Sequence, residues 1–212
     1  MENDSPLSVG FRIMSEADVS SIVEIEKRSF REPWTRERFL QHISGGQASP
    51  CVVLEGEGRV IGYFIVELRA ESTHILNLAI HPDHRRRGHA ARCLTMIHRL
   101  AHRALEIASA RDTTLQPLGG AKLSSAALPS AAGPKSARWQ AQAGASAPRD
   151  RHAGEIYLEV EEGNLTAQLL YRKMGYRATK ILPKHYESLD EDGYLMVRKI
   201  AEKPPEAEAK GA

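Results

Sequence analysis

The chain has 212 residues, 42% of them hydrophobic, and a formal net charge of +2 at pH 7. This length and apolar content support one sizeable core, and a single domain with an insertion fits better than two domains. The small net charge gives no general sign of a polyanionic partner, no run of about 18 apolar residues predicts a membrane span, and the polar start does not resemble a secretory signal.

The first part of the chain predicts a short strand and two helices. Residues 1–10 show no apolar pattern and are expected to be disordered, whereas residues 11–14 alternate as a strand would. Ser15, with an acidic residue three positions later, predicts the start of a helix that ends near Phe30. Thr35 is expected to cap a second short helix.

The apolar period changes to two at residue 51. A hairpin is expected from residues 51–55 and 59–68, which flank a turn containing glycine. Residues 72–80 predict the next strand. The helix that follows Gly88 carries apolar residues at spacings of three and four, so it is expected to pack one face on the sheet and to end near Ala110.

Residues 111–153 differ in composition from everything around them. Of these 43 residues, 24 are Ala, Gly, Ser or Pro, and their six basic and two acidic side chains give a net charge of +4. Such a segment cannot bury enough apolar surface to offset its ordering entropy, which predicts a disordered insertion. A weak RNA contact through this basic insertion and a plain solvated loop both stay open, and Trp139 alone favours a docking contact.

Regular structure is expected again from residue 155. Residues 155–160 predict a strand and residues 165–174 a helix closed by Gly175. Residues 177–182 and 194–199 can pair as the last two strands, and a disordered tail follows at 201–212. The order of elements predicts the α/β class, with one domain over residues 11–200 and helices on the faces of a mixed sheet.

The cysteines and histidines indicate no disulfide or metal site. Cys51 and Cys93 lie far apart in apolar sequence, and we expect them to be buried free thiols of a cytoplasmic protein. No histidine pair has ligand spacing with Cys or acidic partners, so no metal is expected. His98 and His102, four residues apart on one predicted helix, are expected at the surface.

The stretch at residues 76–91 carries the strongest functional signal. An apolar strand ends at Pro82, three arginines and Gly88 follow, and a helix begins at once. A helix N-terminus is partially positive and favours acidic side chains, so arginines at this position predict an anionic ligand. A glycine between strand and helix lets backbone N–H groups approach a diphosphate. The G-x-G-x-x-G and P-loop patterns are absent.

With Arg85-x-x-Gly88-x-Ala90 after an apolar strand, the sequence resembles the GNAT acetyltransferases. Within that superfamily it is similar to the RimI-type ribosomal-protein-alanine N-acetyltransferases. The matching segments are residues 33–35, 77–82, 85–90, 158–160, 164 and 170–176. The resemblance implies the GNAT acyl-CoA N-acyltransferase fold, a central twisted mixed sheet flanked by helices, with acetyl-CoA as co-substrate.

The resemblance also implies roles for single residues. Glu159 would accept a proton and Tyr171 would donate one, while Trp34 and Tyr186 would lie at the peptide pocket. The implied acetyl-CoA-binding residues are Leu78, Ala79, Ile80, Arg85, Arg86, Arg87, Gly88, His89, Ala90, Ala91 and Asn164. The chemistry agrees, because an α-amine with a pKa of about 8 is mostly ammonium at neutral pH and needs a base, and the departing thiolate needs a proton.

Other interpretations of these residues stay open. Glu159 could face solvent from an apolar strand, Tyr171 could be a core aromatic, and Asn164 could be a helix N-cap whatever else it does. Glu161 stands where RimI-type enzymes commonly have arginine, which leaves the acceptor in question.

The sequence therefore predicts a cytoplasmic, monomeric N-acetyltransferase, without membrane contact, that acetylates the N-terminal α-amine of a protein. A ribosomal protein with N-terminal Ala is the expected acceptor. A GNAT enzyme acting on a small amine or a lysine is the alternative within the class. A non-catalytic acetyl-CoA-binding or RNA-binding module is the alternative outside it, although the presence of Glu159 and Tyr171 speaks against an idle site.

Overall fold

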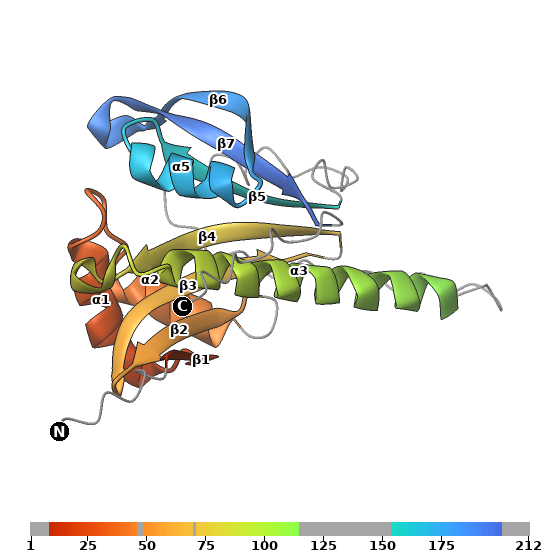
Figure 1. Ribbon diagram of the computed structural model, residues 1–212, viewed down its shortest axis with the longest axis horizontal. Coiled ribbons are helices and arrows are strands. Elements are labelled where there is room, and N and C mark those ends of the chain that lie inside the picture. Colours follow the sequence, from red (N-terminus) through yellow and green to blue (C-terminus); the bar gives the residue numbers. More distant parts are fainter. Residues whose placement is uncertain (1–8, 46–48, 70, 115–153, 201–212) are drawn as a thin grey trace, which may run out of the picture.

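The computed structural model describes residues 9–45, 49–69, 71–114 and 154–200. Within them, seven strands form one mixed sheet in the order β1-β2-β3-β4-β5-β7-β6, and helices cover its faces (Figure 1). The predicted α/β class is confirmed. The expectations for the N-terminal residues 1–8, for most of the insertion with Trp139, and for the tail concern residues outside the described ones, so they stay predictions.

The N-terminal elements are β1 (Val9–Ile13), α1 (Val19–Lys27) and α2 (Arg36–Ser44). β1 pairs along its whole length with β2, so residues 9 and 10 are not disordered as expected; the neighbouring strand supplies an order that their own sequence does not signal. The predicted start at Thr35 is confirmed, whereas Ser15 begins a 3-10 turn (Glu16–Asp18) that leads into α1, and α1 ends at Lys27 instead of near Phe30. The Ser15 N–H donates to the Asp18 carboxylate at 2.8 Å, and Thr35 Oγ1 accepts from the Arg38 N–H.

The middle of the chain forms β2 (Cys51–Gly56), β3 (Arg59–Leu68), β4 (Ser72–Ile80) and α3 (His89–Thr114). The hairpin and the bounds of β4 are as predicted. α3 continues beyond the expected end near Ala110, so residues 111–114 belong to this helix and not to a disordered insertion. The C-terminal part of α3 extends past the sheet (Figure 1).

The last elements are β5 (Glu155–Glu161), α5 (Leu165–Lys173), β6 (Arg177–Tyr186) and β7 (Glu191–Lys199). β6 and β7 pair antiparallel, as predicted, and both are longer than expected. β5 lies between β4 and β7, so it joins the N-terminal strands to the C-terminal pair.

β4 and β5 are joined by very few main-chain contacts. Their parallel pairing covers three residues of β4 and ends where His74 lies opposite Tyr157. Beyond this point β4 continues to Ile80 beside β3 alone, and the two strands diverge (Figure 1). We call this region the split. It begins after His74 on β4 and after Tyr157 on β5. A register shift leaves Leu76 as an extra residue of β4 opposite β3 just after the split begins, as in a β-bulge.

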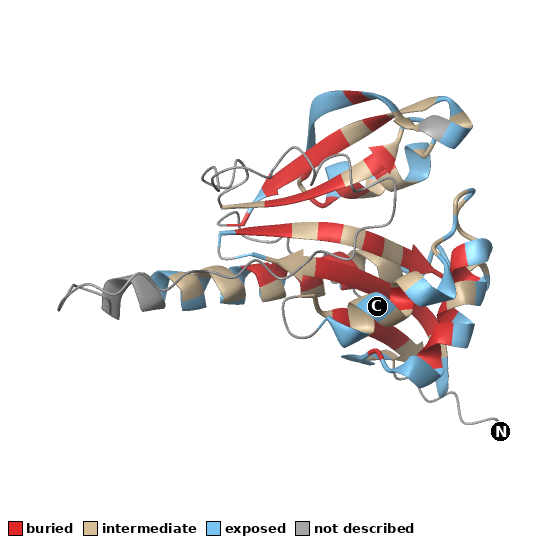
Figure 2. Cartoon of the chain, turned by 180° about the vertical axis from the view of Figure 1, so that it is seen from behind, coloured by how far each residue is buried: buried red, intermediate tan, exposed pale blue. Residues whose placement is uncertain are grey.

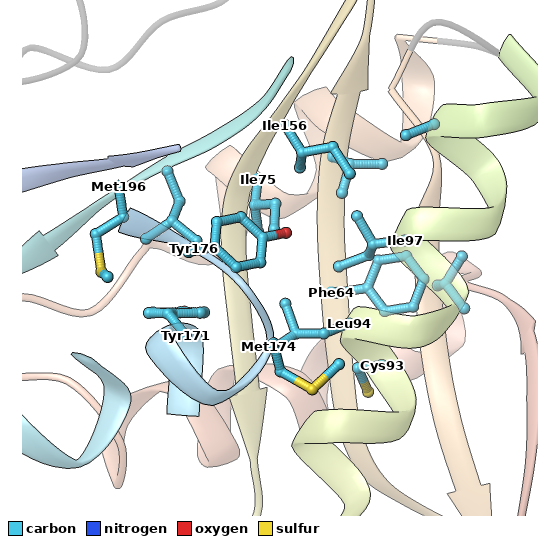
Figure 3. Packing of buried hydrophobic residues seen from close by; sticks show 14 of the residues in the cluster. Phe64, Ile75, Cys93, Leu94, Ile97, Ile156, Tyr171, Met174, Tyr176 and Met196 are labelled. Carbon is cyan, nitrogen blue, oxygen red and sulfur yellow. The ribbon is translucent and has the colours of Figure 1, made fainter. Parts of the chain in front are cut away.

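Two apolar clusters hold the helices on the sheet, and buried residues are concentrated on the strands (Figure 2). One cluster lies between the sheet, α3 and α5, and includes Phe64, Leu94 and Tyr176 (Figure 3). The other packs α1 and α2 on the opposite face through Ile22 and Phe39. No helix in the described part of the chain is long and apolar enough to cross a membrane.

The structure confirms the predicted burial of the two cysteines and corrects the predicted exposure of one histidine. Cys51 and Cys93 are buried free thiols, as predicted, and burial raises their pKa to about 11 and about 12. The surface prediction for His98 is wrong: this side chain is buried, its Nε2 lies 3.0 Å from Tyr176 Oη, and burial lowers its pKa to about 4. α3 buries a wider face than its apolar residues alone indicate. Among the described residues no three Cys, His, Asp or Glu side chains gather as metal ligands.

Candidate active site

The turn between β4 and α3 has the conformation that an anion cradle needs. Arg86 and Gly88 both adopt positive φ, at 65° and 80°. A non-glycine residue in this left-handed region costs about 1 to 2 kcal/mol, so the fold maintains a strained turn here. No heavy atom lies within 4 Å of the place where a Cβ on Gly88 would stand, so the space above the turn is open.

The three predicted arginines of this turn do different things. Arg85 Nε donates to the Ile80 carbonyl at 2.9 Å, and its Nη2 donates to Ser29 Oγ at 2.8 Å. The Arg85 guanidinium therefore fastens the turn to β4 and to the end of α1. Arg86 and Arg87 are exposed, and neither has an ion pair within the described part of the chain. Their positive charges are available to a ligand.

The first turn of α3 supplies an unsatisfied polar group. His89 Nδ1 is buried and has no hydrogen-bond partner among the described residues. Burial, with nearby Arg92, lowers the pKa of His89 and keeps its ring neutral. Ala90 and Ala91 are half-buried against the core, so their small side chains let α3 approach the sheet. The open turn, the free guanidinium groups and the unpaired ring nitrogen together fit a diphosphate.

The end of β4 has main chain without a partner strand on the side of the split. Leu78, Ala79 and Ile80 pair with β3 on one side and have no partner strand on the other. The side chains of Leu78 and Ile80 pack in the cluster under α3, and Ala79 packs in the cluster under α1. Because the core takes up these side chains, the peptide groups of β4 are what a ligand in the split can reach.

Glu159 lies on β5 beside the split and is not a solvent-facing residue. Its Oε2 lies 2.7 Å from His74 Nε2, and the Glu159 side chain is only 20% exposed. The imidazole of His74 stacks on Tyr157, with ring centroids 4.5 Å apart. Burial opposes ionisation of Glu159, but His74 and, to a smaller extent, His185 outweigh it, so the Glu159 pKa lies below its ordinary value.

Tyr171 comes from α5, on the other face of the sheet. It packs in the core cluster, so the core interpretation holds, and burial raises its pKa to about 12. Strand alternation places Glu159 on the opposite face, and no described contact joins the two predicted catalytic residues. The charges of both residues act on Tyr186. Its pKa is raised by burial and also by the charges of Glu159 and Glu161, with a smaller influence from Tyr171.

Asn164 forms the predicted N-cap, because its Oδ1 accepts from the Ala167 N–H at 3.2 Å. It also lines a cavity of about 380 Å³ between the end of α1, the end of β5 and the start of β7. The cavity is lined by Ser29, Phe30, Arg31, Glu161, Gly163, Asn164 and Glu191. Asn164 therefore lies where one residue can both cap α5 and face a ligand.

The two predicted acceptor residues lie in different surroundings. Trp34 is half-buried; its ring stacks on His42 at 5.1 Å, and the Arg38 guanidinium lies 3.7 Å from its ring centroid. Tyr186 instead lies within electrostatic reach of Glu159. Of the two, Tyr186 is the one that the structure brings to the predicted base.

Sequence reasoning missed Glu26, a buried carboxylate at the centre of a hydrogen-bond network. This carboxylate is 1% exposed and accepts hydrogen bonds from the Tyr63 hydroxyl, from Asn77 Nδ2 at 3.1 Å and from the Trp34 N–H at 2.9 Å. Burial raises the Glu26 pKa. The network ties the loop before α2 to β3 and β4. The sequence signal for Glu26 is a carboxylate on the apolar face of α1, four residues after Ile22.

Arg31 was missed as well. Its Nη2 lies 3.1 Å from Glu161 Oε2 and 2.7 Å from Glu191 Oε2. These ion pairs join the loop after α1 to β5 and to β7, and all three residues line the cavity. Nothing in the local sequence of Arg31 indicates partners so distant along the chain.

Comparison with known proteins agrees with this geometry. Residues 19–114 match the model of the acetyltransferase (GNAT) family. A Bacillus subtilis protein provisionally named as a [ribosomal protein bS18]-alanine N-acetyltransferase is 23% identical over 87% of this chain and 91% of its own length. An N-alpha-acetyltransferase from Sulfurisphaera tokodaii is 26% identical over 84% of this chain and 86% of its own length.

Solved structures share the fold. The ribosomal-protein-S18-alanine N-acetyltransferase from Escherichia coli has a TM-score of 0.63 at 17% identity, with 92% of this chain and 96% of that chain covered. Arabidopsis thaliana NAA60 in complex with acetyl-CoA has a TM-score of 0.57 at 17% identity, with 91% and 99% covered. The family match, the split sheet and the turn at Gly88 agree: residues 19–114 match the GNAT family, and most of the chain is similar to N-acetyltransferases.

Proposed function

We propose that the enzyme transfers acetyl from acetyl-CoA to the N-terminal α-amine of a protein, with a ribosomal protein bearing N-terminal Ala as the acceptor. The observation that carries this proposal is the placement of Glu159, a paired and half-buried carboxylate, beside the edge of β4 that has no partner strand. The relatives named for acetylation of α-amines and of ribosomal-protein alanine support the acceptor class.

The donor site lies along β4 and the turn that follows it. The peptide groups of Leu78, Ala79 and Ile80 would align the pantetheine arm, and the turn at Gly88 with Arg86 and Arg87 would hold the diphosphate. When bound, acetyl-CoA supplies an acetyl group activated as a thioester. The surrounding residues then have two tasks: to take a proton from the acceptor and to stabilise the departing sulfur.

Glu159 performs the first task. The acceptor arrives as an ammonium, whose ordinary pKa of about 8 leaves it mostly protonated at neutral pH. A carboxylate kept ionised beside the reacting carbon takes the proton, directly or through one water, and the freed amine attacks the thioester. The low pKa of Glu159 keeps the carboxylate ready to accept throughout the neutral range.

Tyr171 performs the second task. With a pKa of about 12, its hydroxyl stays protonated at neutral pH and has a hydrogen to offer the sulfur. Because an ordinary thiol has a pKa of about 8.5, complete transfer from Tyr171 to the thiolate is unfavourable. Donation of a hydrogen bond is therefore the role that this environment favours.

A small cationic amine is the second candidate acceptor. The cavity beside Asn164 has two carboxylates, Glu161 and Glu191, against the single guanidinium of Arg31. This balance favours positively charged ligands. Spermidine represents the class, and it enters the test below as a competitor of the peptide acceptors.

The test is a turnover assay with acetyl-CoA and a panel of acceptors, with products identified by mass spectrometry. The panel contains peptides with free N-terminal Ala, Ser or Met, a lysine peptide with a blocked terminus, and spermidine. We expect acetylation of α-amines, with Ala preferred. Acetate found only on lysine side chains or on spermidine would sink the proposal.

A further inference from the structure

We propose that His74 is a positioning residue for catalysis, which fixes one oxygen of the Glu159 carboxylate and leaves the other to take the acceptor's proton. This inference rests on the proposed role of Glu159 as the base. It assigns a function to a residue of β4 that lies outside both the cofactor motif and the acceptor loops.

The location of the pair is specific to the split. His74 is the last residue of β4 that pairs with β5, and Glu159 lies two residues past its partner Tyr157. The contact between Nε2 and Oε2, at 2.7 Å, therefore crosses from one strand to the other just as their main chains separate. No ladder hydrogen bonds hold Glu159 to β4, so the side chain of His74 is what relates the base to the donor strand.

The position of the His74 ring is also fixed. It stacks on Tyr157 with an interplanar angle of 14°, and the His74 side chain is only 14% exposed. A ring held in this way has little rotational freedom, so the direction of its Nε2 is set before substrate binds. Such preorganisation is what a general base needs, because a misdirected carboxylate accepts a proton poorly.

The proton balance follows from the ionisation of Glu159. Because Glu159 is a carboxylate at neutral pH, the ring nitrogen that faces it carries the hydrogen and donates to Oε2. The acceptor ammonium then loses its proton to Oε1, directly or through one water. The amine forms the new C–N bond, and the C–S bond breaks with its electron pair leaving on the sulfur. The second proton of the nitrogen passes through water to the thiolate, which gives the amide and the free thiol, and Glu159 returns its proton to solvent.

Other ionisable groups act on the same carboxylate, and they bear on any pH measurement. The imidazole of His185, near the end of β6, adds to the attraction that His74 exerts on Glu159. Tyr186 beside it stays protonated, because burial and the nearby carboxylates raise its pKa. The groups that surround the pair include Tyr157, Glu161, His185 and Tyr186, and Glu67 of β3, which lies opposite His74 in the sheet.

Two substitutions separate hydrogen bonding from packing. His74→Phe keeps a flat ring over Tyr157 and removes the donor, whereas His74→Gln restores an N–H donor without a titratable ring. For His74→Phe we expect kcat to fall about 10-fold, less than the roughly 100-fold or larger loss on removing the base itself. The KM for acetyl-CoA should stay within about 2-fold, and the acidic limb of the pH profile should move to higher pH. His74→Gln should recover most of kcat.

A matched control is available on α3. His102 also faces a carboxylate, with Nδ1 3.3 Å from Glu106 Oε1, but both side chains are more than half exposed. His102→Phe should leave kcat and the pH profile unchanged. Equal effects of His74→Phe and His102→Phe would overturn the proposal, as would a His74→Gln enzyme no faster than His74→Phe.

A readout without turnover keeps this inference separate from the proposed function. The Glu159 carboxyl carbon can be followed by ¹³C NMR, with its signal assigned through Glu159→Gln. We expect its pKa to rise in His74→Phe, and ¹⁵N shifts of the wild type to show the hydrogen on His74 Nε2. An unmoved Glu159 pKa, or the hydrogen on Nδ1 alone, would overturn the inference even if α-amines are acetylated. If the acceptor proves to be another amine, these spectra still decide the role of His74.

Discussion

The rings of Tyr171 and Tyr176 meet edge to face, with centroids 5.7 Å apart and an interplanar angle of 63°. Their hydroxyls differ in hydrogen bonding. Tyr176 Oη lies 3.0 Å from His98 Nε2, whereas no hydrogen bond reaches Tyr171 Oη from the described residues. One of two neighbouring tyrosines thus completes a buried contact, and the other has a hydroxyl that its own fold does not use.

Tyr171→Phe and Tyr176→Phe are expected to have opposite effects. Tyr171→Phe should lower kcat about 10-fold or more with little change in unfolding free energy, because it removes a donor that the fold does not need. Tyr176→Phe should leave His98 unsatisfied and cost about 1 to 3 kcal/mol of stability, while kcat is retained. Steady-state kinetics and urea unfolding check both, and loss of stability in Tyr171→Phe without loss of kcat would contradict the assignment.

Glu159→Gln should slow turnover by about 10²-fold or more, because an amide cannot accept the ammonium proton. Acetyl-CoA affinity, measured by calorimetry, should stay within about 2-fold, since Glu159 lies on β5 and not on the donor strand. A comparable loss of affinity would show that this residue belongs to the donor site.

Gly88→Asp should weaken acetyl-CoA binding by about 10-fold or more, because a carboxylate would stand in the open space meant for the diphosphate. Gly58→Asp is the matched control. Gly58 also has positive φ, at 70°, and no neighbour within 4 Å, but it lies in the β2–β3 turn. Both substitutions introduce the same charge and the same backbone strain. Equal losses of acetyl-CoA affinity would therefore contradict the prediction that the turn at Gly88 binds the diphosphate.

Arg12→Gln should destabilise the fold in a pH-dependent way. The Arg12 guanidinium holds the pKa of Asp18 down to about 2. The stability from a depressed carboxyl pKa is present above the unfolded value of about 3.9 and is lost as pH falls towards about 2. Because Arg12 is 42% exposed, screening limits the cost to about 1 kcal/mol at pH 7. Urea unfolding should show the gap between variant and wild type close between about pH 4 and pH 2; a constant gap would contradict the prediction.

Arg31→Met should make cationic acceptors bind better, because it leaves Glu161 and Glu191 without their shared partner. We expect the KM for spermidine, or for a peptide with lysine beside its N-terminus, to fall several-fold at low salt and the effect to shrink as salt rises. Peptides without added charge serve as the control. The same fall in KM for neutral peptides would indicate a change in loop structure instead of charge.

The sequence predicts local features well where one short segment decides them. Thr35 caps α2 through its own next turn, Asn164 caps α5, and β4 has the bounds that its apolar pattern indicates. The resemblance to a family points to Glu159 and the turn at Gly88 as site residues, and their roles stay predictions. In each case the deciding interaction, or the motif, spans only a few residues.

The remaining features depend on strand register, which sequence patterns do not contain. His74 and Glu159 are 85 residues apart, and they meet only because β4 and β5 pair over three residues and then diverge. Arg31 and Glu161 are 130 residues apart. The surface prediction for His98 failed for a related reason. Its helical spacing shows only that it lies on α3, whereas its partner Tyr176, which makes its burial tolerable, is 78 residues away along the chain.

In the proposed donor site, β4 presents peptide groups to the split, and every amino acid carries the same peptide group. Donor recognition built in this way places little constraint on the side chains of β4, so the sequence can diverge widely while the binding chemistry persists. On the proposed acceptor side, side chains such as Glu161 and Tyr186 would recognise the ligand, so each substitution there would alter what is recognised. Evolution can therefore retarget the enzyme to new acceptors on one side of the split without rebuilding donor recognition on the other.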